Sequence, residues 1–261
     1  MGFNTRIPYM ENPIFHDPKL KLNRANKHIL ELRAVLDTYV QGNVYHIGTD
    51  IDSEGGVRKL HIAKTTPLPS EVPLIIGDVI HNLHTVLDMS IWAIIPEAHR
   101  DRTIKFPFYE TRNELLGQIN KGKIKAHAPG IVDFIINDIK PYKGGNDLIY
   151  GLHVLDITDK HQLLIPILDT IELTGVSGEM SGSGTFHNLN FFIQNLDEIN
   201  AIAGPGDIKI TNYGKAAFKI LFNKGQPFEG QSVIPTLYKL AEIVDGIIDS
   251  VAANVGGMTV R

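Results

Sequence analysis

Between residues 17 and 41, apolar side chains recur at steps of three and four along the chain. Such spacing is typical of one face of an α-helix that packs on a core. Asp17 followed by Pro18 is a typical helix start, because Asp caps free amides and Pro has the backbone angle of a first turn. Gly42 is a typical stop. The pattern therefore predicts a helix over 17–41, with an apolar face at Leu22, Ala25, Ile29, Leu32 and Tyr39.

Later stretches carry the same period. They predict helices over 73–95, which stops at Pro96, over 147–161 and over 230–255. Two shorter helix signals lie between the first two of these. Thr111, with Glu114 three residues later, has the spacing of a capping box. The apolar run in "APGIVDFIINDIKPY" stops at a proline, which cannot continue a helix.

Two other regions have strand character. Residues 43–64 form two runs around the turn "SEGG", which predicts a hairpin. Residues 162–225 contain four runs separated by Gly- and Asn-rich turns: "LLIPILDTIELTG", "GTFHNLNFFIQNL", "DIKITNY" and "KAAFKILFN". Segregated helices and antiparallel strands are typical of the α+β class. We expect one α+β domain over 1–261: a helical bundle with an N-terminal β-hairpin and a C-terminal antiparallel sheet followed by a long helix, with 17–161 mainly helical.

Composition excludes several kinds of chemistry. The chain has 261 residues, 43% of them hydrophobic, which is enough for a core. It has no cysteine, so disulfides, thiolate metal sites and a cysteine nucleophile are excluded. The formal net charge of −4 does not favour nucleic acid as a partner. No run of about 18 apolar residues or signal-peptide core occurs, so we expect a cytoplasmic protein without a membrane partner.

The helix predicted over 73–95 has an unusual polar face. It lacks the Lys and Glu typical of a solvated face and carries Asp78, His81, Asn82, His84, Thr85, Asp88 and Trp92 instead. Side chains three or four positions apart on a helix can touch. One interpretation is a structural face whose imidazoles are satisfied by carboxylates. Another is a site in which His81, His84 and Asp88 form a metal face, although we predict neither a metal nor a cofactor.

A second polar cluster lies at the end of the helix predicted over 147–161. It holds five ionisable residues in nine positions: His153, Asp156, Asp159, Lys160 and His161. Beside several leucines, such groups are costly to bury without partners. The polar face of the helix over 73–95 offers suitable partners. We therefore hypothesise that five residues meet in space, namely Asp78, His81, Asp88, Lys160 and His161.

Four stretches occur in a fixed order: "IIGDVIHNLHTVLDMSIWAI", "FPF", "IKPYKGG" and "GLHVLDITDKHQLL". Together they resemble a family of uncharacterised bacterial and phage-associated proteins with the motifs GD-x-x-HNLR-x-x-LDH, an FP stretch, PY-x-GG and DKHR. The resemblance covers residues 20–170 and implies family polar positions at Asp78, His81, Asn82, Asp88, Asp159, Lys160 and His161. His84, Met89 and Gln162 depart from the motifs, and two of these changes remove an arginine suited to gripping phosphate.

A more distant resemblance is to the helical HEPN nucleases, which cut RNA without metal. The Arg–His spacing of their signature is absent from this chain, so the resemblance is an analogy only. The sequence has one basic run, "KGKIKAH", at 121–127. Such a run can contact phosphate, but it is more often a solvated connection between helices.

Two functional hypotheses follow. The first is a non-catalytic protein that binds a small ligand or a protein partner in a phage or defence setting, with a second copy of the chain as another candidate partner. The second is a hydrolase or phosphoryl-transfer enzyme acting on a nucleotide or RNA. In that enzyme, His81 and His161 would be the general acid and base, Asp78 and Asp88 would orient them, and Lys160 would hold an anionic group. The ligand-binding candidates are Asn82, Trp92, His153, Asp156 and Asp159.

Overall fold

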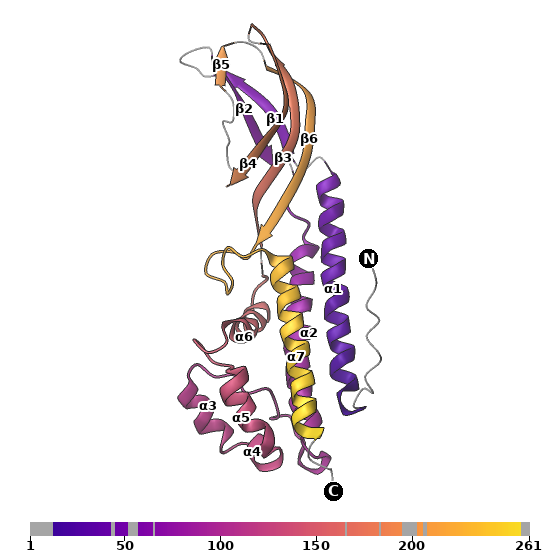
Figure 1. The fold of residues 1–261 in the computed structure, drawn as a ribbon, viewed down its shortest axis with the longest axis vertical. Coiled ribbons are helices and arrows are strands. Elements are labelled where there is room, and N and C mark those ends of the chain that lie inside the picture. Colours follow the sequence, from indigo (N-terminus) through magenta and orange to yellow (C-terminus); the bar gives the residue numbers. More distant parts are fainter. Residues whose placement is uncertain are drawn as a thin grey trace. The chain divides into compact units, whose positions relative to one another are not determined.

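The computed structural model of the protein describes residues 13–42, 45–51, 57–64, 66–164, 166–182, 184–194, 203–205 and 208–256. Its helices are α1 (His16–Gln41), α2 (Glu71–Ile94), α3 (Arg112–Ile119), α4 (Lys123–His127), α5 (Val132–Phe134), α6 (Asp147–Asp159) and α7 (Val233–Gly256). Its strands are β1 (Tyr45–Ile51), β2 (Val57–Lys64), β3 (Ile167–Met180), β4 (Gly184–Gln194), β5 (Ala203–Pro205) and β6 (Ile208–Leu221). Helices together with antiparallel sheets confirm the predicted α+β class (Figure 1).

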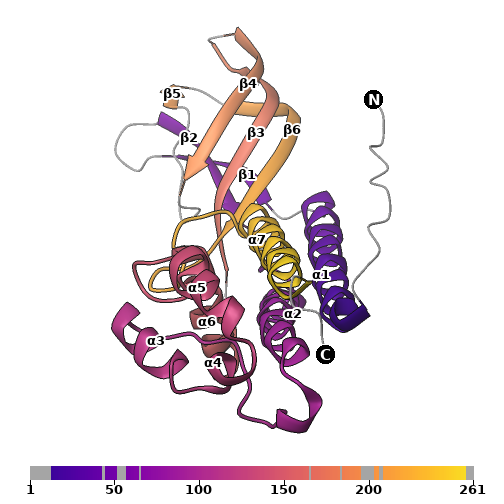
Figure 2. The same cartoon turned by 60° about the horizontal axis from the view of Figure 1, so that its bottom comes forward.

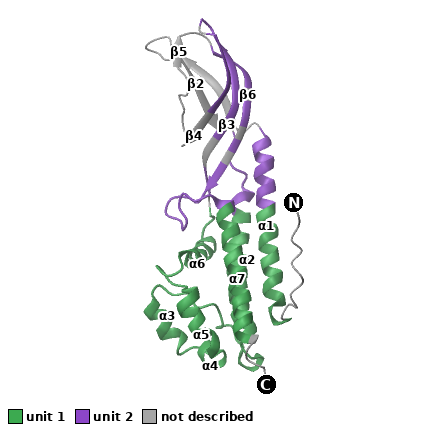
Figure 3. Cartoon of the chain, in the orientation of Figure 1, with its two compact units in different colours: residues 1–30, 74–164, 235–261 green, residues 31–73, 165–234 purple. Residues whose placement is uncertain are grey.

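The described chain divides into two compact units (Figure 3). Unit 1 draws its described residues from 1–30, 74–164 and 235–261, and unit 2 draws its described residues from 31–73 and 165–234. Each unit is assembled from segments that are far apart in the sequence. No single linker therefore separates the two units along the chain, which is why composition marks no boundary.

Unit 1 is built on long helices. The first half of α1 lies beside α2 and α7 in both views (Figures 1 and 2). The apolar face of α2 is fully buried, with Leu83, Val86, Leu87 and Ile91 at 0% exposure. Charged contacts join the neighbouring helices: Lys19 of α1 forms ion pairs with Asp245 and Asp249 of α7. The apolar residues that recur along these helices in the sequence are therefore the residues that pack between them.

Shorter helices complete unit 1. Thr111 caps α3 and its side chain accepts a hydrogen bond from the Glu114 amide at 3.2 Å, while the Glu114 carboxylate accepts from the Thr111 amide, so the predicted capping box is confirmed. Asn146 caps α6, because its side-chain oxygen accepts from the Ile149 amide at 3.3 Å. The last turn of α6 ends at Asp159, two residues earlier than predicted. That difference matters for the site, because it leaves His161 beyond the helix.

Unit 2 contains two three-stranded antiparallel sheets, in the orders β4-β3-β6 and β1-β2-β5. β1 pairs with β2, and the turn predicted between them at "SEGG" lies outside the described residues. The four runs predicted over 162–225 lie together in the first sheet as β3, β4 and β6, whereas β5, which is not one of these runs, pairs with β2 in the other sheet. A strand of three residues is too short for its hydrophobic pattern to indicate which strand it pairs with.

A further difference concerns β6. The sequence predicts two strands, "DIKITNY" and "KAAFKILFN", separated by Gly214, whereas the structure has one strand over Ile208–Leu221. Gly214 has a φ of 71°, and a Cβ there would overlap the carbonyl oxygen of Thr174 and lie 3.0 Å from the amide nitrogen of Val176. Glycine is therefore required by a close approach inside a continuous strand pair, and it does not mark a turn.

Among the helices that the structure describes, none combines the length and the apolar character needed to cross a bilayer.

Candidate functional site

The polar faces of α2 and α6 meet in unit 1 at a buried carboxylate. Asp156 is 1% exposed, and its two oxygens contact different partners. Oδ1 lies 3.1 Å from Nδ1 of His81, and Oδ2 accepts a hydrogen bond from Lys160 Nζ at 2.5 Å. Lys160 caps the end of α6 four positions after Asp156, the spacing at which helical side chains touch. The predicted meeting of the two polar clusters therefore occurs through His81 and Lys160, on either side of Asp156.

Next to this carboxylate, three aromatic rings stack. The rings of Phe108 and His153 are 4.3 Å apart between centroids and 4° from parallel. His84 stacks on both, at 5.1 Å from Phe108 and 5.3 Å from His153. Nε2 of His84 is 3.1 Å from Nδ1 of His153, which is hydrogen-bond distance. A bond between two imidazole nitrogens requires one to donate and the other to accept.

The segment that carries Phe108 is tied to α2 by Asp88. One Asp88 oxygen accepts a hydrogen bond from the Phe106 amide at 2.7 Å, and the other lies 3.5 Å from Nδ1 of His84. The Phe106 side chain is 1% exposed, so it anchors the segment in the core. Asp88 therefore positions the loop after α2 and does not point into solvent as a free carboxylate.

Burial sets the charge of the two stacked imidazoles. It is the main cause that lowers the pKa of His84 to about 4 and the pKa of His153 to about 4, and the positive charges of Lys160 and Lys105 act in the same direction. The negative charge of Asp156 opposes the shift in both rings without cancelling it. Both imidazoles are therefore neutral near pH 7, a state in which one ring nitrogen can donate and the other can accept.

The carboxylates of the cluster are shifted in different directions. Burial would raise the pKa of Asp156, but the hydrogen bond from Lys160 and the contacts with His84 and His81 outweigh it, so this pKa is lowered. Burial raises the pKa of Asp88 and of Asp159, and the charge of Asp156 adds to both shifts. Asp156 is thus the permanent anion around which the cluster is organised.

Asp159 lies against the backbone of α2. A Cβ built on Gly77 would overlap the Asp159 carboxylate, with Cγ at 2.7 Å. A methyl group cannot fit there without displacing that side chain. The glycine of the "GD" motif and the first residue of the "DKH" motif are therefore in direct contact, although they lie on different helices.

The remaining predicted residues lie around this cluster or away from it. Asp78 is exposed, and its carbonyl oxygen accepts a hydrogen bond from the buried side-chain amide of Asn82 at 2.6 Å. Asn82 also accepts from Lys21 at 3.4 Å, so it joins α1 to α2. Trp92 is 39% exposed, and Arg100 lies over its ring, with Cζ 6.0 Å from the ring centroid. Asn82 therefore joins two helices, whereas the ring of Trp92 contacts a residue of the segment that follows α2.

His161 does not join the cluster, which corrects the hypothesis that it meets His81. It is exposed in the turn after α6, and among the described residues its side chain has no hydrogen bond or ion pair. The reason is geometric: Lys160 caps the helix one turn beyond Asp156, whereas His161 lies in the turn that follows the helix. The imidazoles near Asp156 are those of His81 and His84, with His153 beyond them.

Sequence reasoning did not assign a role to Phe106 and Phe108. The signal that marks these two residues in the sequence is the "FPF" stretch. In the described residues, no group of three or more His, Asp or Glu side chains has the arrangement of a metal site. The alternative of a metal face at His81, His84 and Asp88 therefore has no geometric support within them.

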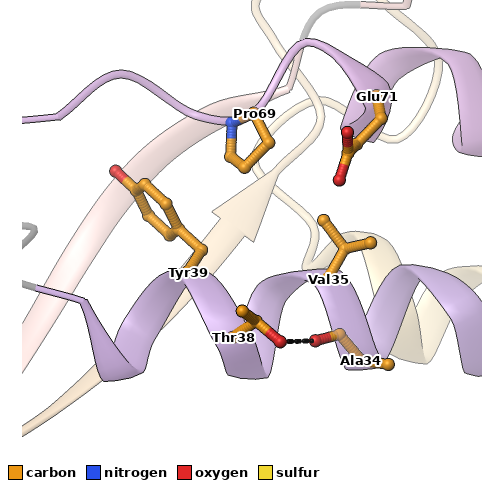
Figure 4. Close-up of a pocket in the computed structure, with 6 residues that line it drawn as sticks. All are labelled: Ala34, Val35, Thr38, Tyr39, Pro69 and Glu71. Carbon is orange, nitrogen blue, oxygen red and sulfur yellow. Dashed lines mark hydrogen bonds between the residues drawn. The ribbon is translucent and has the colours of Figure 1, made fainter.

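Two hollows lie outside the polar cluster itself. One, of about 300 Å³, is lined by residues 103–109 and by parts of α3, α4 and their connection, and Phe108 is one of its walls. The other, of about 320 Å³, belongs to unit 2, where Val35 and Tyr39 of α1 point toward Glu71 and Pro69 (Figure 4). The hydroxyl of Tyr39 donates to the Thr66 carbonyl at 2.6 Å. Neither hollow is lined by His81.

Comparisons of the chain with protein-family models, with curated proteins and with solved structures found no significant match.

Proposed function

We propose that this protein binds a small ligand without catalysis, and that the α2–α6 cluster is a structural network supporting one wall of the binding site. One observation carries the proposal. Phe108 stacks on His153 at 4.3 Å and also lines the hollow of about 300 Å³. The cluster therefore lies behind a wall of a cavity whose size is at the lower end of the range for ligand pockets.

The burial of the cluster supports a structural role. Asp156 is 1% exposed, and His84 and Asn82 are each 8% exposed. Buried polar groups are costly unless they are paired, and Asp156 has partners on both oxygens. A satisfied buried network gives rigidity and fixes which helices pack together. Such a network needs no reaction to explain it.

A second candidate function is favoured by the geometry of His81. Its side chain is 56% exposed, while its Nδ1 faces the buried Asp156 carboxylate at 3.1 Å. A carboxylate on one imidazole nitrogen orients the other for proton transfer. The alternative is therefore a hydrolase or phosphoryl-transfer enzyme acting on a nucleotide or RNA, with His81 as general base. Lys160 would hold an anionic group, and His161 remains a proposed second acid–base residue without a contact that supports it.

The two candidates predict opposite results for His81→Ala. In a binding protein, this variant retains ligand binding and loses stability, because Asp156 loses a partner. In an enzyme, it loses turnover with an unfolding midpoint close to that of the wild type. Thermal unfolding and hydrolysis of a panel of nucleotides and short RNAs, each with His81→Ala and with the matched surface variant His187→Ala on β4, decide between them. Turnover by the wild type that His81→Ala abolishes would overturn the non-catalytic proposal.

Finer expectations belong to the same proposal. They are a hairpin over 43–64, one domain over 1–261, a cytoplasmic location, a protein partner or a second copy of the chain, and membership of the bacterial and phage-associated family that the motifs resemble. The direct contact of Gly77 with Asp159 supports the last of these, since it gives two of the shared motifs a common physical purpose.

A further inference from the structure

The charged side chains that line the hollow beside the cluster are all positive. Three lysines line it, Lys105, Lys121 and Lys123, and no Asp or Glu is among its lining residues. Lys123 already has partners, because it forms an ion pair with Asp101 and donates a hydrogen bond to the His99 carbonyl at 3.1 Å. Lys105 and Lys121 are exposed and form no ion pair within the described residues. Two free cations therefore face a hollow in a chain whose formal net charge is −4.

The charge of Lys105 also reaches the cluster. Burial is the main reason that the pKa of His153 is low, and the ammonium group of Lys105 contributes to the same shift. A fixed positive charge at this place raises the cost of protonating the imidazoles. It also favours an anion at the mouth of the hollow.

The remaining walls are aromatic and polar. Phe108 and Tyr109 line the hollow from the segment after α2, and Gln118 lines it from the end of α3. Phe108 is held in place by its stack on His153, with the ring planes 4° apart. A ring fixed in this way can receive a planar group at little cost in side-chain entropy. Gln118 offers both a donor and an acceptor.

We propose that this hollow binds a nucleoside monophosphate, with the phosphate at Lys105 and Lys121 and the base against Phe108 and Tyr109. This inference rests on the proposed ligand-binding function and names its ligand class. Inorganic phosphate alone would leave the aromatic wall unused, and an uncharged ring would leave two cations without a partner. A hollow of about 300 Å³ is small for a polymer, and the net charge of the chain opposes a polyanion.

The test is calorimetric titration of the full chain with AMP, GMP, CMP and UMP, with adenosine and inorganic phosphate as partial ligands. We expect at least one monophosphate to bind more tightly than either partial ligand. Lys105→Ala and Lys121→Ala should each weaken that binding about ten-fold, the loss typical of a hydrogen bond to a charged group. Lys125→Ala is the matched control, because Lys125 is exposed on α4 and does not line the hollow. Unfolding midpoints near that of the wild type would show that the variants are folded.

Several results would overturn the inference. Adenosine binding as tightly as AMP, or equal losses in Lys125→Ala and Lys105→Ala, would remove the role of the two lysines. The ligand-binding proposal would then survive, because a ligand still binds. If neither these nucleotides nor a library of neutral and cationic aromatic compounds bind, the inference and the proposed function both fail. Monophosphate binding that Lys105→Ala weakens and Lys125→Ala does not would support both.

Discussion

Gly77 of α2 and Asp159 of α6 are in direct contact: the Asp159 carboxylate occupies the space that a Cβ at position 77 would need. Glycine in the middle of a helix ordinarily lowers stability by about 0.5–1 kcal/mol relative to alanine. Here that cost is offset by a close approach of two helices. The contact lies one turn from His81, so it also sets the distance across which His81 reaches Asp156.

Alanine at position 77 should therefore destabilise the protein, against the usual helical trend. We expect Gly77→Ala to lower the free energy of unfolding by roughly 1–2 kcal/mol, the cost of overpacking a tight contact. Asp159→Ala should remove the conflict, so that Gly77→Ala in that background is neutral or stabilising. Urea unfolding of the single and double variants measures the coupling.

Gly246 provides the control for this cycle. It lies within α7, and a Cβ there would meet nothing within 4 Å. Gly246→Ala should raise stability by roughly 0.5–1 kcal/mol through helix propensity alone. If Gly77→Ala is as stabilising as Gly246→Ala, the contact with Asp159 does not constrain position 77.

Removing the charge of Asp156 should be costly for stability. Asp156→Asn leaves Lys160 without its anion and gives His81 an amide in place of a carboxylate. Because the Asp156 side chain is 1% exposed, we expect the free energy of unfolding to fall by about 2–4 kcal/mol. The loss is smaller than for an ion pair buried on both sides, because Lys160 is exposed. Asp138→Asn, at an exposed position, should change stability by less than about 0.5 kcal/mol. Equal midpoints for both variants would contradict a structural role for the network.

Acid should weaken the fold through the two stacked imidazoles, His84 and His153. Burial lowers the pKa of His84 and His153 to about 4, whereas an unfolded His titrates near 6.5. Between these values the unfolded chain binds more protons than the native chain. The stabilisation is therefore complete above pH 6.5 and is lost as pH falls toward 4. We expect the free energy of unfolding to fall by an amount on the order of 2 kcal/mol over this range. This value allows for the partial exposure of His153, which weakens its contribution.

Urea midpoints measured from pH 7.5 to 4.5 test this expectation. His153→Phe keeps a ring that can stack on Phe108 and removes one titrating group. Its midpoint should depend less steeply on pH than that of the wild type over the same range. Parallel profiles would mean that His153 is not held neutral by the fold.

A separate prediction concerns the sheet of unit 2. Gly214→Ala places a methyl group against the Thr174 carbonyl and forces a side chain into a φ of 71°. We expect the free energy of unfolding to fall by roughly 2–3 kcal/mol. Gly182 also has a positive φ, of 81°, but a Cβ there would meet nothing within 4 Å. Gly182→Ala should therefore cost only about 1 kcal/mol, and the difference between the two variants in thermal unfolding isolates the close approach.

Sequence patterns predicted the helices well because their signals are local. The spacing of apolar residues located α1, α2, α6 and α7, and cap residues such as Thr111 located helix starts. Strand partners depend on residues far away in the chain. The pairing of β5 with β2 and the continuity of β6 through Gly214 therefore could not be inferred from the sequence.

The candidate site was predictable in part for the same reason. A helical wheel shows which residues share a face, so His81 and Asp88 were found on α2 and Asp156 and Lys160 on α6. It does not give the exact end of a helix, and α6 ends two residues before His161, which was predicted to be helical. Phe108, which lines the hollow, lies on a segment without hydrophobic periodicity. Its role in the site follows only from its stacking on His153 in the structure.

The ion pair of Lys19 with Asp245 joins residues 226 positions apart in the sequence. During synthesis, Lys19 in the first helix of unit 1 has no partner at Asp245 until the 226 residues that follow it have been made. Until then, apolar side chains of α1 and α2 that are buried beside α7 stay open to water and to other chains. The order of the segments thus makes unit 1 a late-folding unit, because the packing of α1 is complete only after α7 has been synthesised.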